Sequence, residues 1–249
     1  MSARARANQD LLSCIVRIHR QSHETYGSPR VWAVLRRQGV ICGENRVARV
    51  MRWAGLQGRV VKVTRRAPGV HRFYEKNANL RLNQPLPRAV NEQWVGDITY
   101  LKVNGQACFM AVVMDVYSRK VVGWALGRDR TAQLTRRALK HALQRHQPAP
   151  GCIFHSDRGV EYGSSDYSAE LKRHGFRASM NRAYHSQDNA HMESFFHSMK
   201  AEWIRGKSFQ SFENLESSLR AYIRFYNGYR LHSGIDYHTP VEYERRLIQ

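Results

Sequence analysis

Three acidic residues, Asp97, Asp157 and Glu193, carry the strongest indication of chemistry in this sequence. Asp157 follows Asp97 by 60 positions, and 35 residues lie between Asp157 and Glu193. Asp97 lies inside an apolar run, Asp157 closes another, and Glu193 falls on an amphipathic helical pattern. An ionised carboxylate in an apolar strand is costly unless a partner compensates its charge. A cation shared by the three acids would be that partner; alternatively, each acid pairs with an arginine.

The ligand chemistry of these acids favours one kind of metal. Carboxylates without histidine or cysteine partners prefer hard, oxygen-seeking cations, so we expect Mg²⁺ or Mn²⁺ at Asp97, Asp157 and Glu193. Two such ions, roughly 3.5–4 Å apart, can activate an attacking oxygen and stabilise a leaving oxygen in phosphoryl transfer. The acids therefore predict an enzyme that acts on phosphodiesters.

Other charged residues compete with or extend this site. Lys200 follows Glu193 by seven positions and shares its predicted helix face, where it would hold a DNA backbone. The alternative is an ordinary solvated lysine. Asp115 and Glu161 are competing acids, and Asp115 could instead cap the turn that leads to Arg119.

The elements expected to position the acids follow in a recognisable order. Apolar and β-branched runs predict strands, and periodic apolar positions predict helices. The predicted strands are 94–103, 106–114, 120–126, 152–155 and 177–180, and the predicted helices are 131–145, 168–174 and 188–205. Asn104-Gly105 predicts a tight hairpin turn between the first two strands. Three antiparallel strands followed by alternating helices and strands indicate an α/β core.

The N-terminal part is predicted to be helical, with helices at 8–23, from Ser28 to Gly39, and at 45–54. Ser28 would cap the second helix and Pro29 suits its first turn. In the third helix one face is apolar and the other carries three arginines, namely Arg46, Arg49 and Arg52. A short helix pair with a basic second helix indicates a helix-turn-helix that contacts DNA. The alternative is a helical bundle with a solvated basic face.

Charge supports a nucleic-acid partner and suggests the domain organisation. The chain carries a net charge of +20, and residues 1–90 hold 18 basic but only 4 acidic residues. We therefore expect a helix-turn-helix domain over 1–58, a basic linker over 59–90, and a catalytic core with a C-terminal helical tail over 91–249. A basic protein that is merely soluble or ribosome-associated is the alternative.

Cysteine usage and hydropathy exclude several classes. None of the four cysteines forms a Cys-x-x-Cys pair, so neither a disulfide framework nor a zinc module with His19 and His23 is expected. The longest apolar run, 107–114, is too short to span a bilayer, and no signal peptide opens the chain. We expect a cytoplasmic protein with no membrane partner.

The acids lie in motifs that resemble the integrase-type transposases of bacterial insertion sequences, most nearly the OrfB type of the family numbered three. The motifs are Trp94–Tyr100, Asp115–Arg119, His155–Gly159, Asp188–Ala190 with Glu193–Phe196, Tyr26–Arg30, Tyr226–Asn227 and Arg230–Ser233. The resemblance thus covers nearly the whole chain. Two departures are present: Gly96 stands where the family often has threonine, and 184–187 replaces a loop that usually contains Gly-Asn.

The resemblance implies a ribonuclease-H-like integrase core behind an N-terminal helix-turn-helix domain. It implies that Asp97, Asp157 and Glu193 are the catalytic and metal-binding triad, and that Lys200 is the basic residue seven beyond the glutamate. Implied partners are transposon ends, target DNA, further copies of this chain on DNA, and the product of an upstream reading frame. We expect a transposase that cleaves and joins DNA strands. A nuclease of the same fold and a DNA-binding regulator with an inactive core are the alternatives.

Overall fold

The computed structural model describes residues 3–59, 77–82 and 84–246 of the chain. Its centre is a mixed five-stranded sheet in the order β3-β2-β1-β4-β5. The strands are β1 (Gln93–Val103), β2 (Gln106–Asp115), β3 (Val121–Gly127), β4 (Ile153–Ser156) and β5 (Arg177–Met180). Strands β1, β2 and β3 pair antiparallel, whereas β4 is parallel to β1 and β5 is parallel to β4. This topology confirms the expected α/β architecture.

The hairpin between β1 and β2 turns as the sequence predicts. Asn104 and Gly105 both have positive φ, at 45° and 76°, which is the conformation that a two-residue type I′ turn requires. Val103 consequently pairs with Gln106, and this pairing fixes the register of the whole hairpin.

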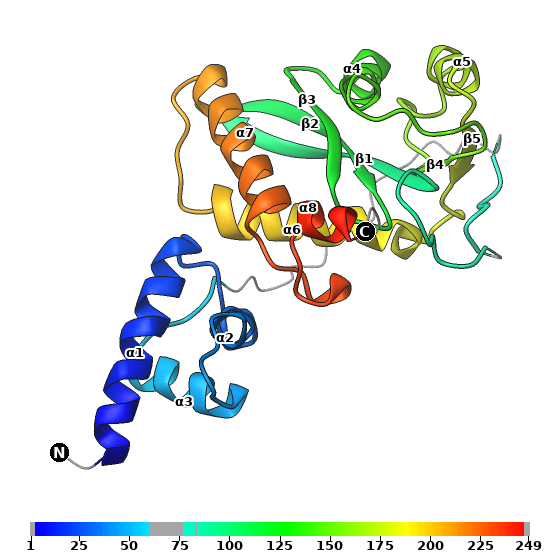
Figure 1. Ribbon diagram of the computed structural model, residues 1–249. Coiled ribbons are helices and arrows are strands. Elements are labelled where there is room, and N and C mark those ends of the chain that lie inside the picture. Colours follow the sequence, from blue (N-terminus) through cyan, green and yellow to red (C-terminus); the bar gives the residue numbers. More distant parts are fainter. Residues whose placement is uncertain (1–2, 60–76, 83, 247–249) are drawn as a thin grey trace.

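Helices cover both faces of the sheet (Figure 1). Helices α4 (Ala132–Leu143) and α5 (Ser165–Arg173) lie on one face, and α6 (Ala190–Met199) and α7 (Phe212–Gly228) lie on the other. Consecutive residues of β1 serve the two layers, because Trp94 packs in the cluster with α4 and α5 while Val95 packs in the cluster with α6 and α7. A sheet buried on both faces explains why its strands read as apolar runs.

The predicted helix over 188–205 is correct in place but divided in the structure. A 3₁₀ turn, η1 (Ser186–Asn189), precedes α6, and a π-helix, η2 (Lys200–Ile204), follows it. The apolar stripe predicted for this helix is buried at Met192, Phe196 and Met199, and its last member, Trp203, is partly buried. Short π-helical turns are rare and occur frequently at functional sites.

The N-terminal part forms three helices, α1 (Ala3–Gln21), α2 (Ser28–Arg37) and α3 (Glu44–Trp53). The prediction that Ser28 caps α2 was wrong, because Ser28 is the first helical residue and the cap position belongs to Gly27, which has no side chain to offer. Pro29 does lie in the first turn, and Gly39, with φ at +76°, follows the helix end as expected.

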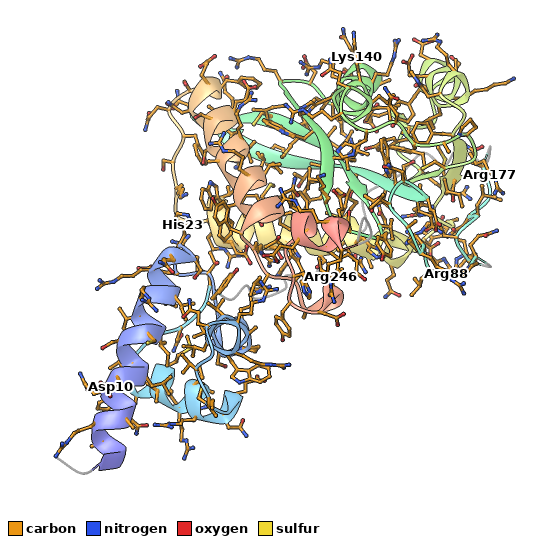
Figure 2. All side chains as sticks on the ribbon, in the orientation of Figure 1. Asp10, His23, Arg88, Lys140, Arg177 and Arg246 are labelled. Atoms are coloured by element: carbon orange, nitrogen blue, oxygen red, sulfur yellow. The ribbon has the colours of Figure 1, made fainter. Side chains whose placement is uncertain are left out.

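The N-terminal helices form a lobe beside the sheet domain, with α1 ending close to α6 and α7 (Figure 1). His23, labelled in Figure 2, lies at this junction. Its ring meets Trp203 and Phe225 edge to face at centroid distances of 5.1 and 5.4 Å. The two parts therefore share packed contacts.

Two short helices complete the C-terminal tail, η3 (Ser233–Ile235) and α8 (Pro240–Arg245), the latter started by a capping box between Thr239 and Glu242. Much of the basic connector lies outside the described residues, namely 60–76 with Lys62, Arg65, Arg66 and Arg72 among them. Among the helices that are described, none has the length and apolar character needed to cross a membrane.

Candidate active site

Two of the three predicted acids lie side by side. Gly96 of β1 pairs in parallel register with Ser156 of β4, so the next residues of the two strands are Asp97 and Asp157. Neighbouring strands are about 4.8 Å apart, and residues in parallel register point to the same face. Both carboxylates therefore emerge together where β4 ends.

The electrostatics of Asp97 reflect this crowding. Burial raises the pKa of Asp97 well above its usual range, and the charges of Asp157 and, more weakly, Glu193 raise it further. The backbone N–H of Ile98 donates to Asp97 Oδ1 at 2.7 Å and, with the charge of Arg130, partly offsets this effect. The carboxyl of Asp97 is therefore harder to ionise than that of a free aspartic acid, and a bound cation would favour its charged form.

Glu193 reaches the same region from α6. Asn189, one turn earlier on the same face, donates from Nδ2 to the carbonyl oxygen of Gly96 at 3.1 Å, directly before Asp97. Glu193 itself is exposed, and its charge acts on Asp97. The structure therefore brings Asp97 and Asp157 together, and it places Glu193 on the exposed side of the same region.

The side chains at this site suit a hard cation in chemistry but do not yet enclose one. Across residues 3–59, 77–82 and 84–246, no three His, Cys, Asp or Glu side chains converge closely enough to enclose an ion. The donor chemistry nevertheless suits a hard cation, since the two adjacent aspartates offer only oxygen atoms and repel one another.

The loop after β4 shapes the pocket around Asp157. The N–H of Gly159 donates to Asp157 Oδ1 at 3.0 Å, and Arg130 lies 3.9 Å from Asp157 Oδ2. Arg130 also pairs with Glu161 at 2.9 Å, while the other oxygen of Glu161, Oε2, is buried and has no partner among the described atoms. A Cβ on Gly159 would lie 2.6 Å from this oxygen and 2.9 Å from Asp157 Oδ1, so a larger residue here would require one of the two carboxylates to move.

Asp115, the other competing acid, has a structural role. Its Oδ1 accepts from the Ser118 N–H and hydroxyl at 2.8 and 2.9 Å, and its Oδ2 accepts from the Asn91 N–H at 2.7 Å. Because both oxygens serve turns, the expectation that Asp115 caps the turn toward Arg119 is confirmed.

A buried histidine, His155, lies two residues before Asp157 and holds the end of β4 through hydrogen bonds to its neighbours. His155 is buried, and its ring nitrogens contact Ser179 Oγ at 2.8 Å and Asn181 Oδ1 at 2.7 Å. Burial and the charge of Arg81 lower the pKa of His155 to about 4. The bond from Ser156 Oγ to the Asp157 carbonyl at 3.0 Å gives the neighbouring serine a supporting role as well.

The loop that departs from the family pattern is held by one carboxylate. Asp188 accepts three hydrogen bonds from Arg182 and one from Asn79, all between 2.9 and 3.1 Å. These bonds, led by the one from the Arg182 side chain, hold the pKa of Asp188 well below its usual range. Tyr184 lies at the loop tip with positive φ and 87 % exposure. The loop thus presents an aromatic ring beside the start of α6.

Gly96, the second departure, is enforced by packing. A Cβ at this position would lie 2.7 Å from Cζ of Phe154 and 3.3 Å from the hydroxyl of Tyr162. A threonine would therefore need Phe154 to move. In this chain the aromatic rings fill the space that the family residue would take.

The predicted DNA-contacting residues occupy different settings. Arg49 and Arg52 are exposed on α3, whereas Arg46 is half-buried and donates to Asn8 Oδ1 of α1 at 2.9 and 3.1 Å. Lys200 is half-buried at the end of α6. The arginine face of α3 therefore has two members open to solvent and one that joins helices.

Sequence reasoning missed two residues that hold the site. Arg130 gave no signal, because it stands far from Asp157 in the chain and arginines are common here. Asn189 did give one, since it precedes Glu193 by one helical turn inside a quoted motif.

Comparison with known proteins defines the class first. Residues 87–186 and 193–247 match families described as Integrase core domain, and residues 6–64 match a family described as HTH-like domain. A chain in the cryo-EM structure of the simian T-cell lymphotropic virus intasome with the PP2A regulatory subunit B56 gamma superimposes with a TM-score of 0.53, at 13% identity, over 92% of this chain and 74% of that one. The fold is thus that of a ribonuclease-H-like integrase core with an N-terminal helix-turn-helix-like domain.

The particular family follows from sequence relatives. Transposase InsF for insertion sequence IS3A of Escherichia coli K12 is 37% identical over the full chain, which covers 86% of that protein. The transposase for insertion sequence element IS904 of Lactococcus lactis is 33% identical over 88% of this chain and 87% of its own length. The chain belongs to the IS3 family of insertion-sequence transposases.

Proposed function

We propose that this transposase cleaves transposon ends and joins them to target DNA at Asp97, Asp157 and Glu193. The observation that carries the proposal is the parallel register of β1 and β4, which puts Asp97 and Asp157 side by side, with the charge of Glu193 acting on Asp97. Acids that crowd one another in this way oppose each other's ionisation, and a bound cation would relieve that repulsion.

The residues would divide the work by position. Asp97 and Asp157 would hold Mg²⁺ or Mn²⁺ from the sheet, and Glu193 would complete the site from α6. The cation would activate the attacking oxygen and stabilise the leaving one. Lys200, on the same helix, would hold the DNA backbone beside the acids.

The chain would use its parts in sequence order. Residues 1–58 would bind DNA through Arg46, Arg49 and Arg52, residues 59–90 would link, and residues 91–249 would carry the reaction. The match of residues 6–64 to an HTH-like domain and the exposure of Arg49 and Arg52 support this division. Assembly of several copies on DNA, and cooperation with the product of an upstream frame, belong to the same proposal.

The test is a strand-transfer assay with labelled element ends and Mg²⁺. Asp157→Asn should abolish cleavage and joining while end-DNA affinity stays close to wild type. Asp166→Asn, the same change at an exposed position of α5, is the matched control and should keep activity. An active Asp157→Asn protein would remove the triad from the reaction.

The assay also separates the alternatives. Cleavage without joining would identify a nuclease, and binding without metal-dependent cleavage would identify a regulator. Thermal unfolding adds a measurement that needs no activity: Mg²⁺ should raise the Tm of wild type and Asp166→Asn more than that of Asp157→Asn.

A further inference from the structure

Two motifs that lie about 200 positions apart form one hydrogen-bonded contact between the N-terminal lobe and the core. The hydroxyl of Tyr26 donates to the carbonyl oxygen of Tyr229 and accepts from the N–H of Leu231, each at 2.9 Å. Arg30 Nε donates to the carbonyl oxygen of Leu231 at 3.0 Å. Side chains of the N-terminal lobe thus engage a short backbone stretch that follows α7.

A buried ion pair lies beneath this contact. Arg230 donates to both carboxylate oxygens of Glu202, at 2.6 and 2.8 Å, and both side chains are only 5% exposed. Arg30 approaches the same carboxylate at 3.8 Å, and the Tyr222 hydroxyl donates to it at 3.3 Å. One carboxylate from the core is therefore shared by two arginines, one from each part of the molecule.

Net stabilisation alone does not explain this cluster of buried charges. Burial and the charge of Arg230 lower the pKa of Arg30, so its guanidinium is held where charge is unfavourable. Buried ion pairs of this kind often contribute little net stability, and in some proteins they specify one geometry instead. Bidentate arginine–carboxylate pairs and hydrogen bonds are directional, whereas apolar contacts are not.

The cluster reaches the helix that carries Glu193. Glu202 lies in the π-helix η2, which continues α6 without a break, and Arg230 Nη2 also donates to Ser198 Oγ of α6 at 3.2 Å. Arg59 donates to the carbonyl oxygen of Glu202 at 3.0 Å. Helix α6 is therefore held at its C-terminal end by the cluster and at its N-terminal end by Asn189.

We propose that Tyr26 and Arg30, acting through Glu202 and Arg230, are positioning residues that fix the N-terminal lobe on α6, so that DNA bound by the lobe is delivered in register to Glu193. The inference rests on the proposed function, in which the lobe binds DNA and Glu193 serves the reaction. The four side chains would couple the position of the lobe to the position of α6. They would not need to contact DNA themselves.

Two variants leave the buried Glu202–Arg230 pair intact and test the coupling. They are Arg30→Gln and Tyr26→Phe. Arg36→Gln is the matched control, because it removes the same charge from the same helix while Arg36 stacks on Trp32 within the lobe at 5.6 Å. All three should bind element-end DNA with similar Kd, and rates are compared at a temperature where each is fully folded, because Tyr26→Phe leaves backbone groups without partners and should lower the Tm.

Cleavage should separate the variants from the control. In single turnover, Arg30→Gln and Tyr26→Phe should cleave about tenfold more slowly than Arg36→Gln or worse, because small misplacements of reacting groups are expensive. Their cuts should also spread to neighbouring phosphodiesters. Wild-type rate and precision in Arg30→Gln, or an equal loss in Arg36→Gln, would overturn the coupling while leaving the catalytic acids untouched.

Hydrogen exchange provides a measurement without DNA, metal or activity. Tyr26→Phe removes the acceptor of the Leu231 N–H, so exchange at that amide should rise about tenfold while amides within α7 keep their rates. Unchanged exchange at Leu231 would overturn the inference. If Asp157→Asn proved active, the proposed function would fail, and the exchange result would still decide whether the lobe is fixed on α6.

Discussion

Asn189 donates a hydrogen bond from Nδ2 to the backbone oxygen of Gly96 at 3.1 Å, and both residues are buried. Asn189 stands at the junction of η1 and α6, and Gly96 directly precedes Asp97. This one bond therefore ties the helix of Glu193 to the strand of Asp97.

Removing this bond should impair catalysis beyond its effect on folding. Asn189→Ala should lower the free energy of unfolding by about 1–3 kcal/mol, because a buried carbonyl loses its donor. At a temperature where the variant is fully folded, cleavage should still be about tenfold slower or worse because α6 is no longer registered against β1. Asn214→Ala, at an exposed position of α7, is the control for stability and rate. Cleavage at the control rate would mean that Asn189 serves only the fold.

The exposed arginines of α3 should dominate the salt dependence of DNA binding. Each phosphate contact contributes about −0.9 to the slope of log K against log salt. The double variant Arg49→Gln/Arg52→Gln should therefore flatten this slope by about 1.8. Arg136→Gln/Arg173→Gln is the matched control. Both arginines pair with Glu170 in the α4–α5 layer, on the face of the sheet opposite α6 and α7. Equal slopes for the two double variants would contradict DNA binding by α3.

His232 should make the stability of the protein fall at acidic pH, because its ring contacts Arg230 of the buried ion pair with Glu202. Its Nδ1 lies 3.2 Å from Arg230 Nη1, which can only donate, so the ring must be neutral with its proton on Nε2 toward the Tyr226 carbonyl. Burial and the charge of Arg230 lower the pKa of His232 to about 2. In the unfolded chain the ring takes up a proton near pH 6.5, so the stability it confers is full above that pH and is lost as pH falls below it.

This linkage can be measured by denaturant unfolding at pH 7 and pH 5. The imidazole of His232 should account for about 2 kcal/mol of the stability lost between these values. His232→Gln keeps an acceptor for Arg230 and a donor for Tyr226 without titrating, so it should lose correspondingly less on acidification. His185→Gln, at an exposed position, should lose as much as wild type. Identical pH profiles for wild type and His232→Gln would refute the assignment.

The strands and the first two acids could be predicted because their signals are local. Alternating and continuous apolar runs set the strands, and Asn104-Gly105 set the hairpin turn. Once two parallel strands are placed, Asp97 and Asp157 must meet, since each stands just beyond a paired residue. The position of Glu193 needed only helical periodicity.

The rest depends on partners far away in the chain. Glu202 is a charged residue in a helical run, and nothing near it indicates that it is buried against Arg230 and Arg30. The break of the predicted helix into α6 and a π-helix likewise has no signal in the local apolar pattern, which runs through both elements. The failed cap at Ser28 is a smaller case, because helix ends shift by one residue without a change in sequence pattern.

Lys200 provides the sharpest test of what the Glu193 face does. Lys200 keeps helical backbone angles at the end of α6, seven residues beyond Glu193, so the two side chains remain two turns apart on one side. If that side meets DNA, Lys200→Ala should reduce strand transfer strongly with a Tm close to wild type, because Met192, Phe196 and Met199 still bury the helix. Lys172→Ala, which removes the same charge from an exposed position of α5, should join DNA normally. A lower Tm with a proportionate loss of joining would show that Lys200 serves stability. Wild-type joining would show that Lys200 and Glu193 share a helix face without sharing a function.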